Sequence, residues 1–301
     1  MTSFRFVHTG DIHLDSPLKG LADYERGAAE RIRMATREAF DNLVSQVIDE
    51  EASFVIISGD LYDGDWRDYQ TGLYFIRQMG RLARARIPAF LLYGNHDAES
   101  QITRRLTLPD NVKVFSTRKP ETFELKSLSV ALHGQGFRQR DIEVNLALSY
   151  PEPIESMFNI GVLHTGLGGM GGHANYAPCA LDDLVNKGYD YWALGHVHQG
   201  EILHERPHVV FPGSLQGWHI RETGPKGACL VTVADWIGSN ESFFSPETHG
   251  TPDEVRTLAK SALQKIGWPG GSLVSRPFQD VFGFPKNPLQ SSVLSRIQVP
   301  A

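Results

Sequence analysis

The first third of the chain alternates between apolar runs and segments with helical periodicity. Residues 4–11 and 87–97 are strand-like, and residues 53–60 form a continuous apolar run that ends in Gly-Asp, which is typical of a strand buried on both faces. Residues 25–50 and 69–86 carry apolar side chains at helical spacing. This order of strand, helix, strand, helix and strand predicts βαβ units and a largely parallel sheet.

The middle of the chain changes to a β pattern. Residues 121–137 predict antiparallel strands joined by turns, and residues 158–166 and 189–200 predict two more buried strands. Further strands are expected within residues 204–219 and 226–235. We therefore predict an α/β fold in which two sheets form a sandwich that is flanked by helices.

The C-terminal end of the chain has a different composition. Residues 251–267 are compatible with one helix, but Pro, Gly and Ser make up 14 of the 35 residues from 267 to 301, and no periodicity is visible there. Such a composition is typical of loops or disordered segments. We therefore expect one folded domain at residues 1–245 and a tail at residues 246–301 that is disordered after its one possible helix.

Composition and charge narrow the class of protein only slightly. The 301 residues are 41% hydrophobic and 21% charged, as in ordinary globular proteins, and the net charge is −6. Because the chain is not basic, a nucleic-acid partner would need a local basic patch. Cys179 and Cys229 show neither metal-binding spacing nor a disulfide framework. With no signal peptide or membrane-spanning segment in the sequence, we expect a cytoplasmic protein without a membrane partner.

Polar side chains follow five of the predicted strands, at the point where each strand ends. In chain order these residues are Asp11 and His13, then Asp60, then Asn95, His96 and Asp97, then His164, and finally His196 and His198. Open α/β sheets bind ligands at the carboxyl ends of their strands, so we expect these side chains to converge. A single histidine in such a place is more often structural, but five such groups favour a functional site.

The expected ligand set combines four imidazoles, two carboxylates and one amide oxygen, and it contains no thiolate. Such mixed nitrogen and oxygen sites suit Mn, Fe or Zn. Seven ligands are too many for one ion and suit two ions that share a bridging carboxylate, about 3.5–4 Å apart. We predict that Asp60 is the bridge. One site is then completed by Asp11, His13 and His198, and the other by Asn95, His164 and His196.

Two further residues are candidates for catalysis rather than for metal binding. His96, next to Asn95, is placed to donate a proton to a leaving oxygen or to stabilise its charge. Asp63 could fix the tautomer of His96 through the other ring nitrogen. His133 also ends a strand, but no second type of ligand lies beside it in the sequence, so its role is open.

The motifs D-x-H, G-D, G-N-H-D, a lone H and G-H-x-H together resemble those of the calcineurin-like metallophosphoesterases. The phrases GDIHLDSPL, SGDLYDGDW, NYAPCALDDL, GYDYWALGHVHQ and RETGPKG resemble more closely the Mre11/SbcD-like DNA repair exonucleases, and among them the bacterial YhaO group. The resemblance covers about residues 4 to 235. It implies a four-layer αββα sandwich with mixed sheets, Mn²⁺ as the activating ion, His96 as the catalytic histidine and hydrolysis of phosphodiesters in DNA. It also implies a Rad50/SbcC-like ATPase partner and, by analogy, a homodimer.

Two departures from the family pattern bear on substrate binding. Ser214, Leu215 and Trp218 stand where relatives often have an Asn after the Gly and an Arg before the His, and that Arg could have contacted substrate phosphate. Relatives also usually continue into a longer C-terminal region that covers the substrate and docks the partner, so the tail at residues 246–301 could be a truncated form of that region. We therefore expect weak activity on long duplex DNA.

Four arginines in loops near the strand ends are the candidates for contact with DNA. They are Arg104, Arg105, Arg138 and Arg140. Three functions are compatible with the site: a DNA exonuclease or endonuclease, a phosphatase or phosphodiesterase acting on a small molecule or a phosphoprotein, and a non-catalytic binding module. The complete ligand set argues against the third function. The family phrases and these arginines favour the first over the second.

Overall fold

The computed structural model describes residues 2–16, 26–64, 69–100, 106–169, 175–217, 222, 224–236 and 293–299. These residues belong to one unit, which is formed by residues 1–239 together with residues 291–301. Residues 240–290 form a second unit. That unit lies outside the described residues, and so does the helix that the sequence predicts at residues 251–267.

The first of two six-stranded sheets has the strand order β12-β11-β1-β2-β3-β4. Its strands are β1 (Thr2–Thr9), β2 (Phe54–Ile57), β3 (Ala89–Leu91), β4 (Val112–Val114), β11 (Gly227–Trp236) and β12 (Val293–Val299). Strands β1 to β4 are parallel, as the alternation of strands and helices predicts, and β11 is antiparallel to β1. The carboxyl ends of β1, β2 and β3 therefore lie at one edge of the sheet.

The second sheet has the strand order β5-β6-β7-β8-β10-β9. Its strands are β5 (Glu121–Leu125), β6 (Val130–Gly134), β7 (Phe158–His164), β8 (Tyr191–Gly195), β9 (Glu201–Glu205) and β10 (His208–Phe211). The pair β5–β6 is antiparallel, which confirms the prediction for residues 121–137, and β9 is antiparallel to β10. Strands β6, β7, β8 and β10 are parallel, so β7 and β8 also end at a common edge.

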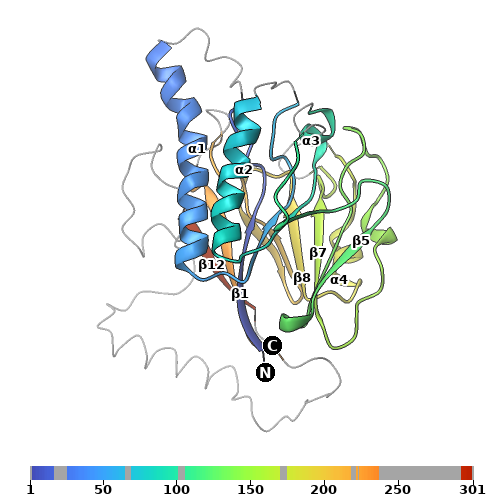
Figure 1. The fold of residues 1–301 in the computed structure, drawn as a ribbon. Helices are drawn as coiled ribbons and strands as arrows, with labels where there is room; N and C mark the ends of the chain where they lie inside the picture. Colours follow the sequence, from blue (N-terminus) through green and yellow to red (C-terminus); the bar gives the residue numbers. More distant parts are fainter. Residues whose placement is uncertain are drawn as a thin grey trace, which may run out of the picture. The chain divides into compact units, whose positions relative to one another are not determined.

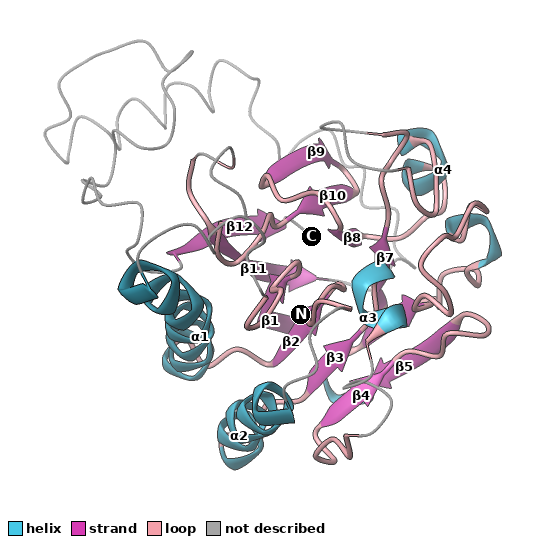
Figure 2. Cartoon of the chain, turned by 90° about the horizontal axis from the view of Figure 1, so that it is seen from above, coloured by secondary structure: helices cyan, strands magenta, loops and turns pink. Residues whose placement is uncertain are grey.

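Two long helices cover the outer face of the first sheet, whereas loops and the short helix α4 (Leu181–Val185) lie beside the second sheet, as Figures 1 and 2 show. Helices α1 (Arg26–Asp49) and α2 (Tyr69–Arg84) pack side by side on the first sheet. The other helices are short, namely α3 (Asn95–Glu99), α4 (Leu181–Val185) and the 3-10 turns Lys126–Leu128 and Ala147–Ser149. The predicted αββα sandwich is confirmed, although its second helical layer is thin. No helix in the described part of the chain combines the length and the apolar character needed to cross a membrane.

Aromatic side chains form the core between the two sheets. The rings of Phe6 and Phe54 stack with centroids 4.9 Å apart, and Phe4 meets Phe158 of the second sheet edge-on at 5.6 Å. Val7 points the other way, into the apolar layer beneath the helices. Because successive side chains of a strand point to opposite faces, the alternation along β1 fills both layers and fixes its register.

The last strand, β12, differs from the expectation of a disordered tail. It pairs in parallel with β11 along its whole length, and Ile297 and Val299 are buried in the layer between the sheets. Arg296 on the same strand forms an ion pair with Glu50 of the loop after α1, at 2.6 Å. Because Pro, Gly and Ser are frequent before residue 293, the sequence pattern did not indicate the short strand that follows. The folded domain therefore includes the segment Val293–Val299, which the predicted boundary at residue 245 excluded.

Gly161 on β7 leaves room for the indole of Trp192, which is fully buried. A Cβ atom at this position would lie 2.3 Å from the indole ring. We expect Gly161→Ala to lower the free energy of unfolding by about 1–3 kcal/mol, the usual cost of overpacking a core. Gly80→Ala in α2 is the control, because its Cβ would meet only Arg84 at 3.9 Å. It should stabilise the protein by up to about 1 kcal/mol. Equal urea midpoints for the two variants would contradict this packing.

Candidate metal centre

The loops that follow β1, β2, β3, β7 and β8 meet at the carboxyl ends of these strands. Backbone hydrogen bonds join the first two loops: the N–H of Asp11 donates to Gly59 O and that of His13 to Asp60 O, each at 3.0 Å. All seven predicted ligands lie within the described residues. Six of their donor atoms fall into two groups, each with its atoms within 4.8 Å of one another. One group comes from Asp11, His13 and His198, and the other from Asp60, His164 and His196.

Asn95 and Asp60 complete and connect these groups. Asn95 begins α3, four residues after the last residue of β3, and its Oδ1 lies 2.9 Å from Nε2 of His164. Oδ2 of Asp60 lies 3.4 Å from Nε2 of His164 and 3.9 Å from Nε2 of His13. The other oxygen of Asp60 accepts a hydrogen bond from the backbone N–H of His96 at 2.9 Å. One carboxylate thus faces both groups.

Four of the clustered residues have backbone conformations that non-glycine residues rarely adopt. The φ angle is 48° at Asp11, 45° at His13, 51° at Asp60 and 104° at His196. Such conformations are strained by about 1–3 kcal/mol each and persist only where surrounding contacts impose them. Their concentration at the ends of three different strands favours a functional role for the cluster over a purely structural one.

The donor distances and tautomers fit bound cations. Nε2 of His13 and Nε2 of His198 are 3.3 Å apart, and two donors about 2.0–2.2 Å from one ion are separated by about 3–3.5 Å. Nδ1 of His164 donates to Ser58 O at 2.9 Å, so the ring presents its Nε2 lone pair to the cluster. Nδ1 of His198 faces the carboxylate of Glu222 at 2.8 Å, with the same consequence. Each mixed group could therefore hold a divalent cation.

Charges within the cluster balance one another. Burial alone would raise the pKa of Asp60, but the rings of His164, His96 and His13 hold it well below its usual value. Burial would lower the pKa of His164, whereas Asp60 and Asp11 raise it to about 9. Burial lowers the pKa of His13 to about 3, which keeps this ring neutral. A cation bound beside Asp60 would take the place of the proton on His164, because metal ligands must be deprotonated.

His96 lies at the mouth of the cluster. Its Nδ1 is 3.1 Å from Oδ1 of Asp63, whose other oxygen accepts a hydrogen bond from Ser16 Oγ at 2.7 Å. The His96 side chain is 19% exposed, whereas that of His164 is fully buried. Burial alone would lower the pKa of His96, but the bond to Asp63 and the charge of Asp60 raise it above its ordinary value. The structure therefore joins the two residues that the sequence singles out for catalysis.

Asp97, the last residue of the G-N-H-D motif, has a role that sequence reasoning missed. Its buried carboxylate accepts backbone hydrogen bonds from Leu61 at 3.2 Å, Tyr62 at 2.9 Å and Gly94 at 3.0 Å. It therefore connects the loop after β2 to the loop after β3.

Gly94 must lack a side chain, since a Cβ there would lie 2.3 Å from Oδ1 of Asp60.

Of the four arginines predicted to contact DNA, Arg140 has the most informative position. Its Nη1 donates to Glu99 Oε2 at 3.1 Å and its Nε to the hydroxyl of Tyr176 at 3.4 Å. Glu99 shares α3 with His96, and the Tyr176 ring lies 5.5 Å from that of His196. Arg140 is thus at the rim of the cluster. Arg138 is exposed, and Arg104 and Arg105 lie outside the described residues.

The other residues that the sequence left open are structural or lie outside the described residues. His133 is in neither donor group: its ring nitrogens contact Thr122 Oγ1 at 2.8 Å and Asn159 Oδ1 at 3.0 Å. Ser214 is buried beneath His198, to whose carbonyl its backbone N–H donates at 3.2 Å. Leu215 is part of the apolar core. Trp218 is not among the described residues.

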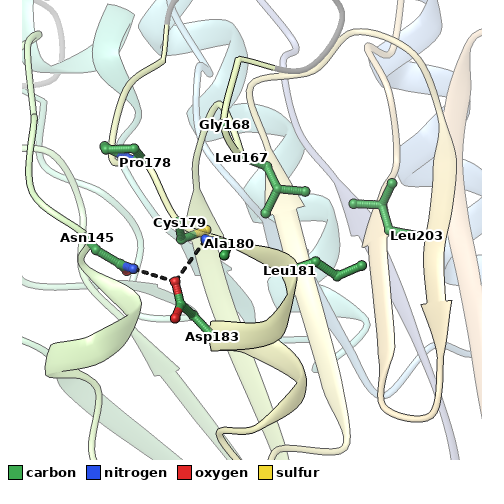
Figure 3. Close-up of a pocket in the computed structure, with 9 residues that line it drawn as sticks. All are labelled: Asn145, Leu167, Gly168, Pro178, Cys179, Ala180, Leu181, Asp183 and Leu203. Atoms are coloured by element: carbon green, nitrogen blue, oxygen red, sulfur yellow. Dashed lines mark hydrogen bonds between the residues drawn. The ribbon is translucent and has the colours of Figure 1, made fainter.

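A cavity of about 610 Å³ lies beside α4 and does not include any of the predicted ligands. Figure 3 shows that Asn145 and the backbone of Ala180 both point to the carboxylate of Asp183, to which they donate at 2.8 Å. The other walls are mostly apolar and include Leu181 and Leu203. The carboxylate of Asp183 is thus already hydrogen-bonded within the protein. Unlike the strand ends, the cavity is therefore not lined by a group of metal-binding donors among the described residues.

Two mixed sheets carry a cluster of His, Asp and Asn donors at their carboxyl edge, which is the type of donor set that two-metal phosphoesterases use. Residues 4–200 match the calcineurin-like phosphoesterase family, and the chain belongs to this family. The family assignment made from the motifs is confirmed. Members of this family are described as phosphoesterases.

The chain is similar in sequence to two proteins within and near this family. The metallophosphoesterase YhaO of Bacillus subtilis (strain 168) is 35% identical over 239 residues, which are 78% of this chain and 59% of YhaO. The DNA double-strand break repair protein Mre11 of Sulfurisphaera tokodaii is 27% identical over 249 residues, which are 77% of this chain and 60% of Mre11. The chain therefore spans less than two thirds of the length of either relative.

Solved structures with a similar fold have low sequence identity to the chain. A dimetal phosphatase from Danio rerio is 12% identical, with a TM-score of 0.45, and the match covers 76% of this chain and 92% of that one. The protein TT1561 of Thermus thermophilus is 15% identical, with a TM-score of 0.43, over 71% of this chain and 91% of that one.

Proposed function

We propose that the protein is a metal-dependent phosphodiesterase that acts on DNA, as an exonuclease of the Mre11/SbcD type. The observation that carries this proposal is the pair of donor groups, one of which contains Asp60 while the other has His13 Nε2 at 3.9 Å from the same carboxylate. Similarity to an Mre11 protein supports DNA as the substrate. We further propose two Mn²⁺ ions as cofactors, and an ATPase of the Rad50/SbcC type and a second copy of the chain as partners, because the resemblance of the sequence motifs implies them.

Three residues of the chain would have distinct roles in the hydrolysis. Divalent cations, when bound, lower the pKa of a water molecule and offset negative charge on the phosphoryl oxygens. His96 would give a proton to the leaving oxygen from the mouth of the cluster. Asp63 would hold the His96 ring through Nδ1, so that Nε2 is the nitrogen presented to the substrate. Ser16, through its bond to Asp63, would keep that carboxylate in place.

A phosphatase or phosphodiesterase acting on a small molecule is the second candidate. The net charge of −6 and the pairing of Arg140 with Glu99 favour it, because both reduce attraction for a polyanion. The test is an assay of the Mn²⁺-loaded protein on linear duplex DNA, single-stranded DNA and a small phosphodiester. We expect cleavage of DNA. Hydrolysis of the small ester alone would support the second candidate, and no turnover with metal bound would overturn both.

Arg140→Ala should weaken DNA binding and flatten its salt dependence. Loss of one phosphate contact should change the slope of log K against log salt by about 0.7–0.9. Binding is measured by fluorescence anisotropy in a His96→Ala background, in which cleavage of DNA is expected to be about 10²–10⁴-fold slower. Arg81→Ala is the matched control, because Arg81 lies on α2 and pairs with Asp41 at 2.9 Å. Equal slopes for the two variants would exclude Arg140 as a phosphate contact.

A further inference from the structure

The segment RETGPKG, residues 221–227, contains none of the predicted ligands or catalytic residues, yet Glu222 and Lys226 lie against the cluster. Oε1 of Glu222 is 2.8 Å from Nδ1 of His198, and its Oε2 is 3.3 Å from Nζ of Lys226. Nζ of Lys226 also donates to the backbone carbonyl of His198 at 3.0 Å. Two charged side chains of one loop thus hold both the ring and the backbone of a proposed ligand.

The bond between Glu222 and His198 determines which ring nitrogen faces the cluster. An ionised carboxylate only accepts hydrogen bonds, so Nδ1 of His198 must carry the proton. The lone pair of Nε2 then points toward Nε2 of His13 at 3.3 Å and toward Oδ1 of Asp11 at 3.9 Å. This is the tautomer that a metal ligand in this position needs.

The two donor groups differ in the hydrogen-bond acceptor that contacts Nδ1 of a histidine ring. Behind His164 the acceptor is a neutral backbone carbonyl, Ser58 O, which belongs to the loop after β2. Behind His198 the acceptor is a charged carboxylate from a different loop, 24 residues further along the chain. The Glu222 side chain is 18% exposed, so solvent screens this contact less than it would at the surface. Replacing Glu222 should therefore affect one group and not the other.

We propose that Glu222 is a positioning residue for the ion held by Asp11, His13 and His198, and that it acts by fixing the tautomer and direction of the His198 ring. The proposal rests on the metal-binding part of the function proposed above. Partners of this kind typically change metal affinity by roughly 10–100-fold when they are removed. Lys226 has a supporting role, since it holds the second oxygen of Glu222.

The competing explanation is that Glu222 and Lys226 simply close the loop as an ion pair. The two explanations differ for variants made from opposite ends of the pair. Glu222→Leu removes both the ion pair and the acceptor for His198. Lys226→Met removes the ion pair but leaves the carboxylate in contact with the ring. A loop-closing pair predicts equal effects, whereas a positioning residue predicts a much larger effect for Glu222→Leu.

The experiment is a calorimetric titration of the full chain and its variants with Mn²⁺, with thermal unfolding measured in parallel. We expect Glu222→Leu to weaken one of two ions by roughly 10–100-fold and to leave the other within about threefold. Lys226→Met should stay within about threefold for both ions. Glu152→Leu is the control, since Glu152 forms a surface ion pair with Lys187 at 3.1 Å.

A second readout does not depend on how the variants fold. In the Zn²⁺-loaded wild type, ¹H–¹⁵N spectra of the histidine rings should show His198 bound through Nε2, with a slowly exchanging Nδ1 proton. Binding through Nδ1, or a rapidly exchanging Nδ1 proton, would overturn the proposal, as would equal loss of affinity in Glu222→Leu and Lys226→Met. Neither measurement uses DNA, so the absence of DNA cleavage by the wild type would refute the proposed substrate without affecting this result.

Discussion

His96→Ala is expected to keep both metal ions and to lose turnover on DNA by about 10²–10⁴-fold, the usual range for a positioned acid or base. The ring belongs to neither of the two donor groups that contain the predicted ligands, and its Nδ1 is engaged with Asp63. Removing it should therefore leave the ligands of both groups in place. The measurement is the metal content and the turnover rate of the same preparation.

The leaving group of the substrate gives this prediction its control. An ester of p-nitrophenol needs little protonation, so the loss caused by His96→Ala should shrink on that substrate. His13→Ala should instead lose metal and recover partly at high Mn²⁺. His13, Asp63 and His96 also bring donor atoms within 4.8 Å of one another. If His96→Ala loses an ion, or slows both substrates equally, His96 is a ligand or a phosphate clamp and not the general acid.

Asp60→Asn should cause a larger loss of metal than any other single ligand replacement. Oδ2 of Asp60 faces His164 in one group and His13 in the other, so the change removes negative charge from both sites. Asn can still accept the hydrogen bond from the backbone of His96, which protects the fold of the loop. Elemental analysis of the desalted variant should find both ions reduced.

Asp11→Asn is the matched control for the bridging role. Asp11 belongs to the group with His13 and His198 only, and its carboxylate also accepts the backbone N–H of His196 at 2.9 Å. We expect this variant to lose one ion and to keep the other. If Asp11→Asn and Asp60→Asn lose the same amount of metal, Asp60 does not serve two ions.

The sequence predicts the fold and the cluster well where local pattern and topology agree. Apolar runs such as residues 53–60 end in polar residues, and parallel strands place their carboxyl ends at one edge, so ligands distant in the chain can be grouped without coordinates. The convergence of the seven donors follows from these two facts, whereas the four-layer αββα order is expected from the family resemblance. The structure places β2, which Asp60 follows, between β1 and β3 in the sheet.

The features that sequence reasoning missed depend on contacts between distant segments. β12 has only seven residues and lies after a Pro-, Gly- and Ser-rich stretch, and it becomes a strand because β11 offers a free edge. Asp97 and Glu222 act through hydrogen bonds to loops and rings that no sequence spacing indicates. Their only signals are the last letter of G-N-H-D and the unexplained phrase RETGPKG. Arg104, Arg105 and Trp218 lie outside the described residues, so their predicted roles stay predictions.

The central claim is that seven side chains at the ends of five strands hold two ions. The most direct test is the number of Mn²⁺ ions bound per chain by the wild-type protein, measured by elemental analysis after saturation and removal of free metal. The distances within the two groups, and the position of Asp60 between them, predict two ions per chain. A single ion in the fully loaded protein would contradict the account.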